Sequence, residues 1–363
     1  MRIPGKRCCC TASKTGILAR LSQAPKRLDS KMDEPAAYLN GRWIAADDAA
    51  VLVDDAGFVL GVSVAEQLRT FRGKLFRLED HLDRLARSLK IVGFDPGLGL
   101  DEIGAIAEEL AARNHRLLDP ADDLRLAIVV TPGIHPAYGA QRRQVSDDAA
   151  PLSASPAGPT LCMHTHPLSF QLWAKEYRSG QSLATTSVQQ VPASCWPSEL
   201  KCRSRMHYYL ADRQAAAADP RARALLLDAE GFVTEASTAN LLVHRIGEGL
   251  ISPPAEKILP GISMSAVMEF AVELGITCLR RNLTVEEVAA ADEAMLTSTS
   301  TCILPVARLN GRPIGEGRPG PIYRELLAAW SRAVGVDIAA QAERFAAVAN
   351  IPARAIGPAR RLR

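Results

Sequence analysis

The chain has 363 residues, 47% of them hydrophobic, 23% charged and 5% aromatic, a composition typical of a globular protein long enough for two domains. No run approaches the roughly 20 apolar residues that span a bilayer, which argues against an integral membrane protein. Eight Lys/Arg and one Asp in residues 1–31 more than account for the formal net charge of +3, so the remainder lacks the basic surface of a nucleic-acid binder.

The N-terminal segment, residues 1–31, is interpreted as an extension upstream of a start at Met32. Because it is rich in Arg and Lys, an organelle transit peptide is the alternative, but it lacks the apolar core of a secretory signal. The cysteines, three of them consecutive at 8–10, show no CxxC spacing, which indicates a reducing compartment. We therefore expect a cytoplasmic protein. A metal shared by Cys195 and Cys202 is less favoured than isolated thiols.

Short strands followed by helices are predicted from Ala37 onward. Asn40-Gly41 and Arg72-Gly73 each lie between apolar segments, a pattern typical of hairpin turns. A helix over 79–93 carries leucines on one face and ends near a glycine. Further expected elements are a helix over 100–114, strands over 123–131 and 160–168, and a surface loop over the Pro-, Ala-, Ser- and Gly-rich residues 133–158.

The mixed pattern continues in the second half. The expected elements are a strand over 181–191, a helix over 200–218, strands around a turn within 223–245, a helix over 263–275, a strand-loop-strand over 293–306 and a closing helix over 323–334. The sequence thus predicts a mixed α/β protein with an N-terminal extension (1–31), a small N-terminal domain (32–167), a large C-terminal domain (168–345) and a basic tail (346–363).

Anion-binding patterns stand out among the candidate sites. No GxGxxG or GxxxxGK[ST] motif is present, so neither dinucleotide nor P-loop chemistry is indicated. Gly261 precedes a predicted helix whose first amides favour phosphate, and the hydroxyls of LTSTSTC (296–302) suit phosphate oxygens, although each also fits an ordinary cap or turn. Glu235 would need a cationic partner if buried. His164 and His166 share a strand face, but the sequence offers no third metal ligand.

Seven segments occur in the order and spacing of a known family. They are YLNGRW, DAGFVLGVSVAEQLRTFRGKLFRLEDHLDRLARS, ELKCRSRMHYYLADRQA, LLLDAEGFVTEASTANLLV, ILPGIS, ADEAMLTSTSTCILPV and LNGRPIGEGRPGP. Through them, residues 37–330 resemble the class IV aminotransferases, pyridoxal-phosphate enzymes of fold type IV. This group includes branched-chain aminotransferases, D-amino-acid aminotransferases and aminodeoxychorismate lyases. The resemblance implies a two-domain α/β enzyme with pyridoxal 5'-phosphate between its domains and, as in its relatives, a homodimer.

The resemblance also implies roles for individual residues. Lys201 matches the lysine that forms a Schiff base with the cofactor, and its amine must be neutral to attack, which burial beside a cation favours. Glu235 would face the pyridine nitrogen and keep it protonated, so the ring supplies the cationic partner. The other implied cofactor contacts are Arg84, Ile262, Ser263 and Thr299 at the phosphate and Leu259 against one ring face.

Positions expected to face the substrate depart from the family pattern. Several relatives have a tyrosine shortly after the lysine, where this chain has Arg205 and Met206. On the predicted helix, Arg205 lies one turn after Lys201 on the same face. There it would bind a substrate carboxylate or lower the lysine pKa, a solvated or ion-paired side chain being the alternative. Ser300, in the hydroxyl-rich turn, is the second candidate for substrate contact.

We therefore expect a pyridoxal-phosphate-dependent aminotransferase that acts on an amino acid and a 2-keto acid, branched-chain-like or D-amino-acid-like. The alternative is a 4-amino-4-deoxychorismate lyase that eliminates pyruvate, in which Arg205 would suit a di-anionic substrate. A non-catalytic protein that has kept the fold is less favoured, because Lys201, Glu235 and Arg84 are all present. No nucleic acid, membrane or metal partner is expected.

Overall fold

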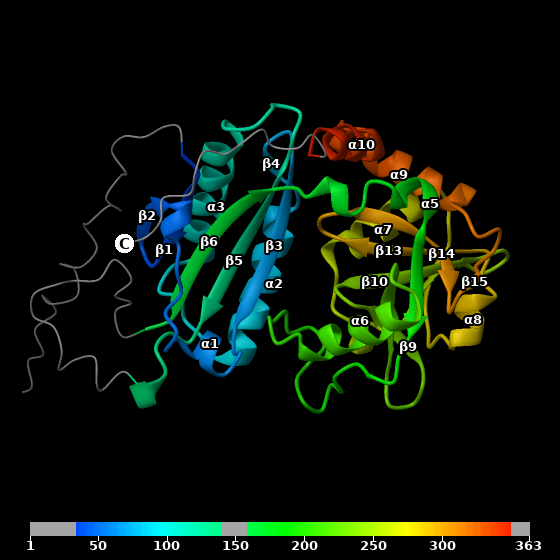
Figure 1. The fold of residues 1–363 in the computed structure, drawn as a ribbon, viewed down its shortest axis with the longest axis horizontal. Coiled ribbons are helices and arrows are strands. Elements are labelled where there is room, and N and C mark those ends of the chain that lie inside the picture. Colours follow the sequence, from blue (N-terminus) through cyan, green and yellow to red (C-terminus); the bar gives the residue numbers. More distant parts are fainter. Residues whose placement is uncertain (1–33, 139–157, 350–363) are drawn as a thin grey trace, which may run out of the picture.

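A computed structural model describes residues 34–138 and 158–349 and contains two β-sheets (Figure 1). The first sheet has six strands in the order β2-β1-β6-β5-β3-β4, and every pair is antiparallel. Its strands are β1 (Ala36–Leu39), β2 (Arg42–Ala45), β3 (Val64–Phe71), β4 (Lys74–Leu75), β5 (Leu124–Thr131) and β6 (Thr160–Pro167). The two turns with positive φ, at Asn40-Gly41 and Arg72-Gly73, close the β1–β2 and β3–β4 hairpins, as predicted.

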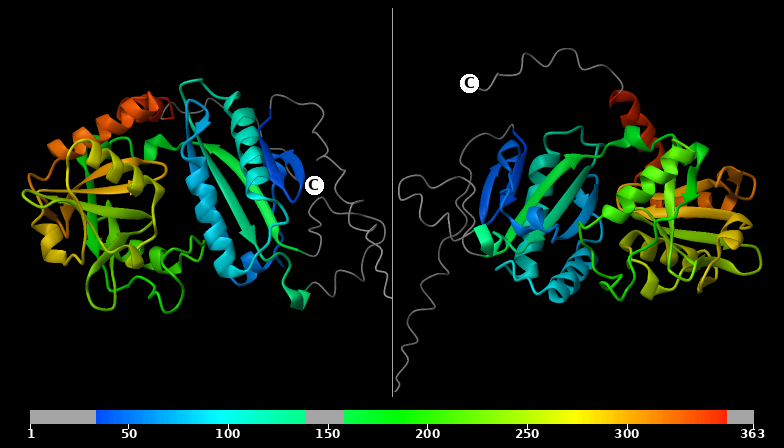
Figure 2. Two further views of the ribbon diagram at one scale, coloured as in Figure 1. Left: turned by 180° about the vertical axis from the view of Figure 1, so that it is seen from behind. Right: turned by 60° about the horizontal axis from the view of Figure 1, so that its bottom comes forward.

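Two helices, α2 (Leu78–Val92) and α3 (Leu100–His115), pack against the first sheet (Figure 2). Their buried leucine and isoleucine side chains meet the alternate residues of β3 and β5 that point toward them. Gly93 ends α2 in the left-handed conformation, with φ 72°, which glycine adopts without a Cβ penalty. The short helix α1 (Ala56–Val59) precedes β3. This packing places one flank of α2 toward the second half of the chain.

The second sheet has nine strands, and six of them close into a ring. Because β9 pairs with both β8 and β10, the pairing runs β8-β9-β10-β13-β14-β7 and returns to β8. The strands of this sheet are β7 (Gln181–Thr185), β8 (Ala222–Leu227), β9 (Val233–Ala236), β10 (Ala239–Arg245), β11 (Gly249–Ser252), β12 (Cys278–Arg280), β13 (Glu293–Ser298), β14 (Cys302–Leu309) and β15 (Arg312–Pro313). Functional residues at the ends of these strands can therefore face a common space.

Helices surround the second sheet (Figure 1). They are α5 (Glu176–Ser179), α6 (Met206–Ala218), α7 (Ile262–Glu273), α8 (Val285–Ala289), α9 (Pro321–Val334) and α10 (Ile338–Ala349), with 3-10 turns at Ala46–Asp48, Phe170–Leu172 and Ala255–Lys257. Buried Phe270 and Trp330 join α7 and α9 in one apolar core. Within the described residues, no helix is both long and apolar enough to cross a membrane.

The predicted fold class is confirmed, with differences at particular elements. The predicted helix over 200–218 is wrong in its first turn, because helix α6 begins at Met206. The predicted strand over 181–191 ends at Thr185, and α10 continues beyond residue 345 to Ala349. The predicted N-terminal extension, most of the loop after residue 138 and the rest of the basic tail lie outside the described residues.

Leu85 tests the packing of α2, because it is fully buried between that helix and the first sheet. We expect Leu85→Ala to lower the free energy of unfolding by about 2 to 5 kcal/mol, through lost burial and the cavity left behind. Lys90→Ala on the exposed face of the same helix serves as the control and should change stability little. Denaturant titration measures both, and equal effects of the two variants would contradict this packing.

Candidate active site

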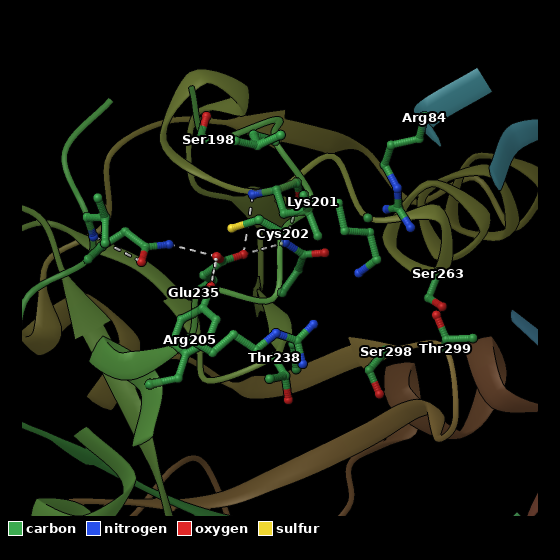
Figure 3. A pocket seen from close by; sticks show the side chains of 18 of the residues that line it. Arg84, Ser198, Lys201, Cys202, Arg205, Glu235, Thr238, Ser263, Ser298 and Thr299 are labelled. Atoms are coloured by element: carbon green, nitrogen blue, oxygen red, sulfur yellow. Dashed lines mark hydrogen bonds between the residues drawn. The ribbon is translucent and has the colours of Figure 1, made fainter. Parts of the chain in front are cut away.

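A pocket lies where the loops of the second sheet meet α2 of the first half (Figure 3). Most of the residues predicted from the sequence line it: Arg84, Lys201, Arg205, Glu235, Leu259, Ile262, Ser263 and Thr299. In the view of Figure 3, Arg84, Ser263 and Thr299 lie on one side, Glu235 on the other and Lys201 between them. The pocket thus separates an anion-attracting side from a carboxylate side.

Ser300 does not line this pocket. Its hydroxyl accepts a hydrogen bond from the Gln67 side chain of β3 at 3.0 Å, and its carbonyl accepts one from Arg69 at 2.9 Å. The turn between β13 and β14 therefore directs Ser300 toward the first sheet, while Ser298 and Thr299 line the pocket.

Lys201 lies in a loop rather than on a helix. Its carbonyl accepts a hydrogen bond from the Ala65 amide at 2.9 Å, its own amide donates to Ser88 Oγ at 3.2 Å, and Cys202 bridges to Val64. The backbone here pairs with the start of β3, which prevents the helical pairing that we predicted. Arg205 therefore does not lie one helical turn from Lys201; it caps α6 with φ −115° and still lines the pocket.

The Lys201 amine is surrounded by positive charge. Burial, reinforced by the guanidinium groups of Arg84, Arg205 and Arg203, lowers the pKa of Lys201 to about 7, although Glu66 opposes the shift. Cations disfavour the protonated amine, and burial disfavours any charge. About half of the Lys201 side chains are therefore neutral, and nucleophilic, near neutral pH.

Arg84 is held by a buried carboxylate that the sequence reasoning did not assign to the site. Its Nε and one terminal nitrogen donate to Glu66 at 2.7 and 2.8 Å, and its other nitrogen donates to the Pro260 carbonyl at 2.8 Å. Burial would raise the pKa of Glu66, but Arg84 and a hydrogen bond with His81 hold it well below its usual range. Glu66 could have been noticed as a carboxylate within an otherwise apolar strand.

Glu235 is buried on β9 and accepts four hydrogen bonds. Oε1 accepts from the Tyr208 hydroxyl at 2.6 Å and from the Gln190 amide at 2.7 Å. Oε2 accepts from the Asn240 amide at 3.1 Å and the Leu259 backbone at 3.3 Å. Burial raises the pKa of Glu235 even though these donors oppose it, because its low-dielectric site disfavours the anion. A nearby cationic ring nitrogen would favour the charged form.

The anion-attracting side is built from backbone amides and hydroxyls. Helix α7 begins at Ile262 after Gly261, which provides no side-chain cap, so its first amides are available to a ligand. A Cβ on Gly261 would lie 1.9 Å from Asn240 Oδ1, so only glycine fits there. Thr297, also in the pocket lining, has a buried hydroxyl without a hydrogen-bond partner among the described residues.

His164 and His166 lie on one face of β6, as predicted, with ring centroids 5.1 Å apart. Burial, with the positive charge of neighbouring groups, lowers the pKa of His164 to about 4. The part of the chain that the structure describes contains no group of three His, Cys, Asp or Glu side chains suited to a metal ion.

Comparisons with known proteins agree with this geometry. Residues 63–309 match the model of the family described as amino-transferase class IV. The chain belongs to this family. A Methanocaldococcus jannaschii protein, provisionally named a branched-chain-amino-acid aminotransferase, is 31% identical over 80% of this chain and 93% of its own length. A D-alanine aminotransferase from Bacillus licheniformis is 27% identical over 81% and 95%.

Solved structures share the fold. A branched-chain aminotransferase from the archaeon Thermoproteus uzoniensis, determined with norvaline, superposes with a TM-score of 0.67 at 29% identity, covering 83% of this chain and 95% of its own. A bacterial-type branched-chain amino acid aminotransferase determined with pyridoxamine 5'-phosphate superposes with a TM-score of 0.70 at 25% identity, covering 84% and 96%. The fold type IV architecture implied by the sequence is therefore confirmed.

Arg205 tests the electrostatic origin of the Lys201 pKa. Because its positive charge disfavours the protonated amine, we expect Arg205→Gln to raise the pKa of Lys201 above about 7. The measurement is the rate of Lys201 labelling by an amine reagent, followed by peptide mass spectrometry as a function of pH. Arg213→Gln, an exposed site on α6, is the control. A midpoint that is unchanged, or that falls, in Arg205→Gln would contradict this origin.

Proposed function

We propose that this class IV aminotransferase uses pyridoxal 5'-phosphate to transfer an amino group between an amino acid and a 2-keto acid, with Lys201 as its catalytic residue. The observation that carries the proposal is the joint placement of a buried lysine amine with a pKa near 7 and a buried carboxylate in one pocket with an anion-binding side. A shifted lysine pKa of this kind is characteristic of a nucleophile.

The residues present fit the cofactor. The first amides of α7, at Ile262 and Ser263, and the Thr299 hydroxyl would hold the phosphate, with Arg84 adding positive charge. Leu259 would pack against one face of the ring, and Glu235 would face the ring nitrogen. The unpartnered Thr297 hydroxyl also supports the presence of a ligand on this side. When bound, pyridoxal phosphate supplies an aldehyde for covalent attachment and a ring that takes up electrons from the substrate Cα.

Each chemical step then uses groups of this chain. The neutral Nζ of Lys201 attacks as a nucleophile and later accepts the Cα proton of the amino acid, with general base catalysis favoured by a pKa near the working pH. Glu235, in its charged form, keeps the facing ring nitrogen protonated. Arg205, at the entrance to α6, offers its guanidinium to a substrate carboxylate. The amino acid and the keto acid use this site in turn.

An aminotransferase is favoured over the lyase alternative by the named relatives, which are a branched-chain-like enzyme and a D-alanine enzyme. The same two names leave both stereochemical classes as candidate substrates. A panel of L- and D-amino acids, followed by conversion of the visible absorbance of the loaded enzyme, distinguishes them. Release of pyruvate from aminodeoxychorismate without an amino acceptor would instead identify a lyase.

We also propose a cytoplasmic homodimer. Phe58 and Leu60, at α1, and Met206, at the start of α6, expose large apolar side chains, and a hydrogen bond from Ser204 Oγ to the Gly61 carbonyl joins their two loops. Such exposed apolar groups are typical of an interface between subunits. The described cysteines carry no disulfide, in keeping with a reducing compartment.

Removal of the Lys201 amine tests the proposed function directly. We expect the purified wild-type protein with pyridoxal phosphate to show a visible absorbance band, and Lys201→Ala to lose that band and at least roughly 10²-fold in turnover, since general base catalysis alone contributes that much. Lys175→Ala, at an exposed lysine, is the control. A wild type that stays colourless when saturated with the cofactor would sink the proposed function.

A further inference from the structure

The Glu235 carboxylate is approached by donors from separate parts of the chain. Tyr208 belongs to the first turn of α6, Gln190 to the irregular segment after β7, Asn240 to β10 and Leu259 to the segment before α7. The two shortest of these bonds, from Tyr208 and Gln190, reach the same oxygen, Oε1. Figure 3 shows the dashed lines converging on Glu235.

Tyr208 is suited to act as a permanent donor. Burial and the neighbouring Glu235 carboxylate raise the pKa of Tyr208 well above its ordinary value, so the phenol keeps its proton and donates it to the carboxylate in a hydrogen bond. Its ring packs against the His207 ring, with centroids 4.0 Å apart, which restricts the side chain. The next residue, Tyr209, is 60% exposed and does not line the pocket.

A donor to the anion matters at this position because burial alone favours the neutral carboxyl. Lys201 is the charged group whose field reaches Glu235, and it too lowers the pKa of the carboxyl. Near neutral pH, however, Lys201 is only partly protonated. The hydrogen bonds from Tyr208, Gln190 and the Leu259 amide therefore supply the larger part of the stabilisation of the charged form.

We propose that Tyr208 is a positioning residue that acts through Glu235: its hydroxyl orients the carboxylate and favours the charged form that the cofactor's ring nitrogen requires. The inference rests on the proposed function for its catalytic consequence, but the interaction itself belongs to the chain alone. Tyr208 occupies this role from α6, the helix that follows Lys201, so the segment that carries the nucleophile also carries the group that controls Glu235.

The first experiment compares Tyr208→Phe with Tyr209→Phe in the full chain without added cofactor. Tyr208→Phe removes a hydrogen bond to a charged group, which corresponds to about a tenfold change in equilibrium constant. We expect the pKa of Glu235, followed by carbon-13 NMR of the labelled carboxyl, to rise by about one unit in Tyr208→Phe, and to stay unchanged in Tyr209→Phe. An unchanged pKa in Tyr208→Phe would overturn the inference.

The second experiment adds pyridoxal phosphate. We expect Tyr208→Phe to bind it about tenfold more weakly near neutral pH, with the acid side of the binding profile shifted to higher pH. In a Glu235→Gln background, Tyr208→Phe should have no further effect on the profile, because its partner can no longer ionise. An equal shift in both backgrounds would show a merely structural role and overturn the inference. A wild type without cofactor affinity would instead sink the proposed function, while the Glu235 pKa would still decide the inference.

Discussion

Glu66 and Arg84 form a buried ion pair that joins β3 to α2, and the same guanidinium reaches the Pro260 carbonyl just before α7. Leaving either charge buried without the other would cost several kcal/mol, so the pair constrains how these elements lie. The neighbouring residue on β3, Ala65, donates to the Lys201 carbonyl. Two successive residues of one strand thus hold the nucleophile loop and the start of α7 beside the same pocket.

The arrangement has an electrostatic consequence. Arg84 is paired with Glu66, yet its charge, together with those of Arg205 and Arg203, still lowers the pKa of Lys201. On the other side of the pocket, Glu235 has hydrogen-bond donors but no fixed cation among the residues that donate to it. A ligand with an anionic group at one end and a protonatable nitrogen at the other complements both sides, and pyridoxal phosphate has that charge pattern.

The sequence was most informative where local patterns decide the structure. The Asn-Gly and Arg-Gly turns and the leucine face of α2 were predicted because their causes lie within a few residues. The loop at Lys201 was predicted as a helix because its backbone partner, the start of β3, is distant in sequence. The roles of Tyr208 and Gln190 were missed for the same reason: nothing near either residue indicates that both meet Glu235. Individual site residues came from family resemblance rather than from periodicity.

The most direct test of the central claim is to locate the covalent attachment of the cofactor. The protein is saturated with pyridoxal phosphate, reduced with borohydride, digested and analysed by peptide mass spectrometry. The account predicts a stable phosphopyridoxyl adduct on the peptide that contains Lys201, and its loss in Lys201→Ala. An adduct that forms mainly on another lysine, or no adduct at all, would contradict it.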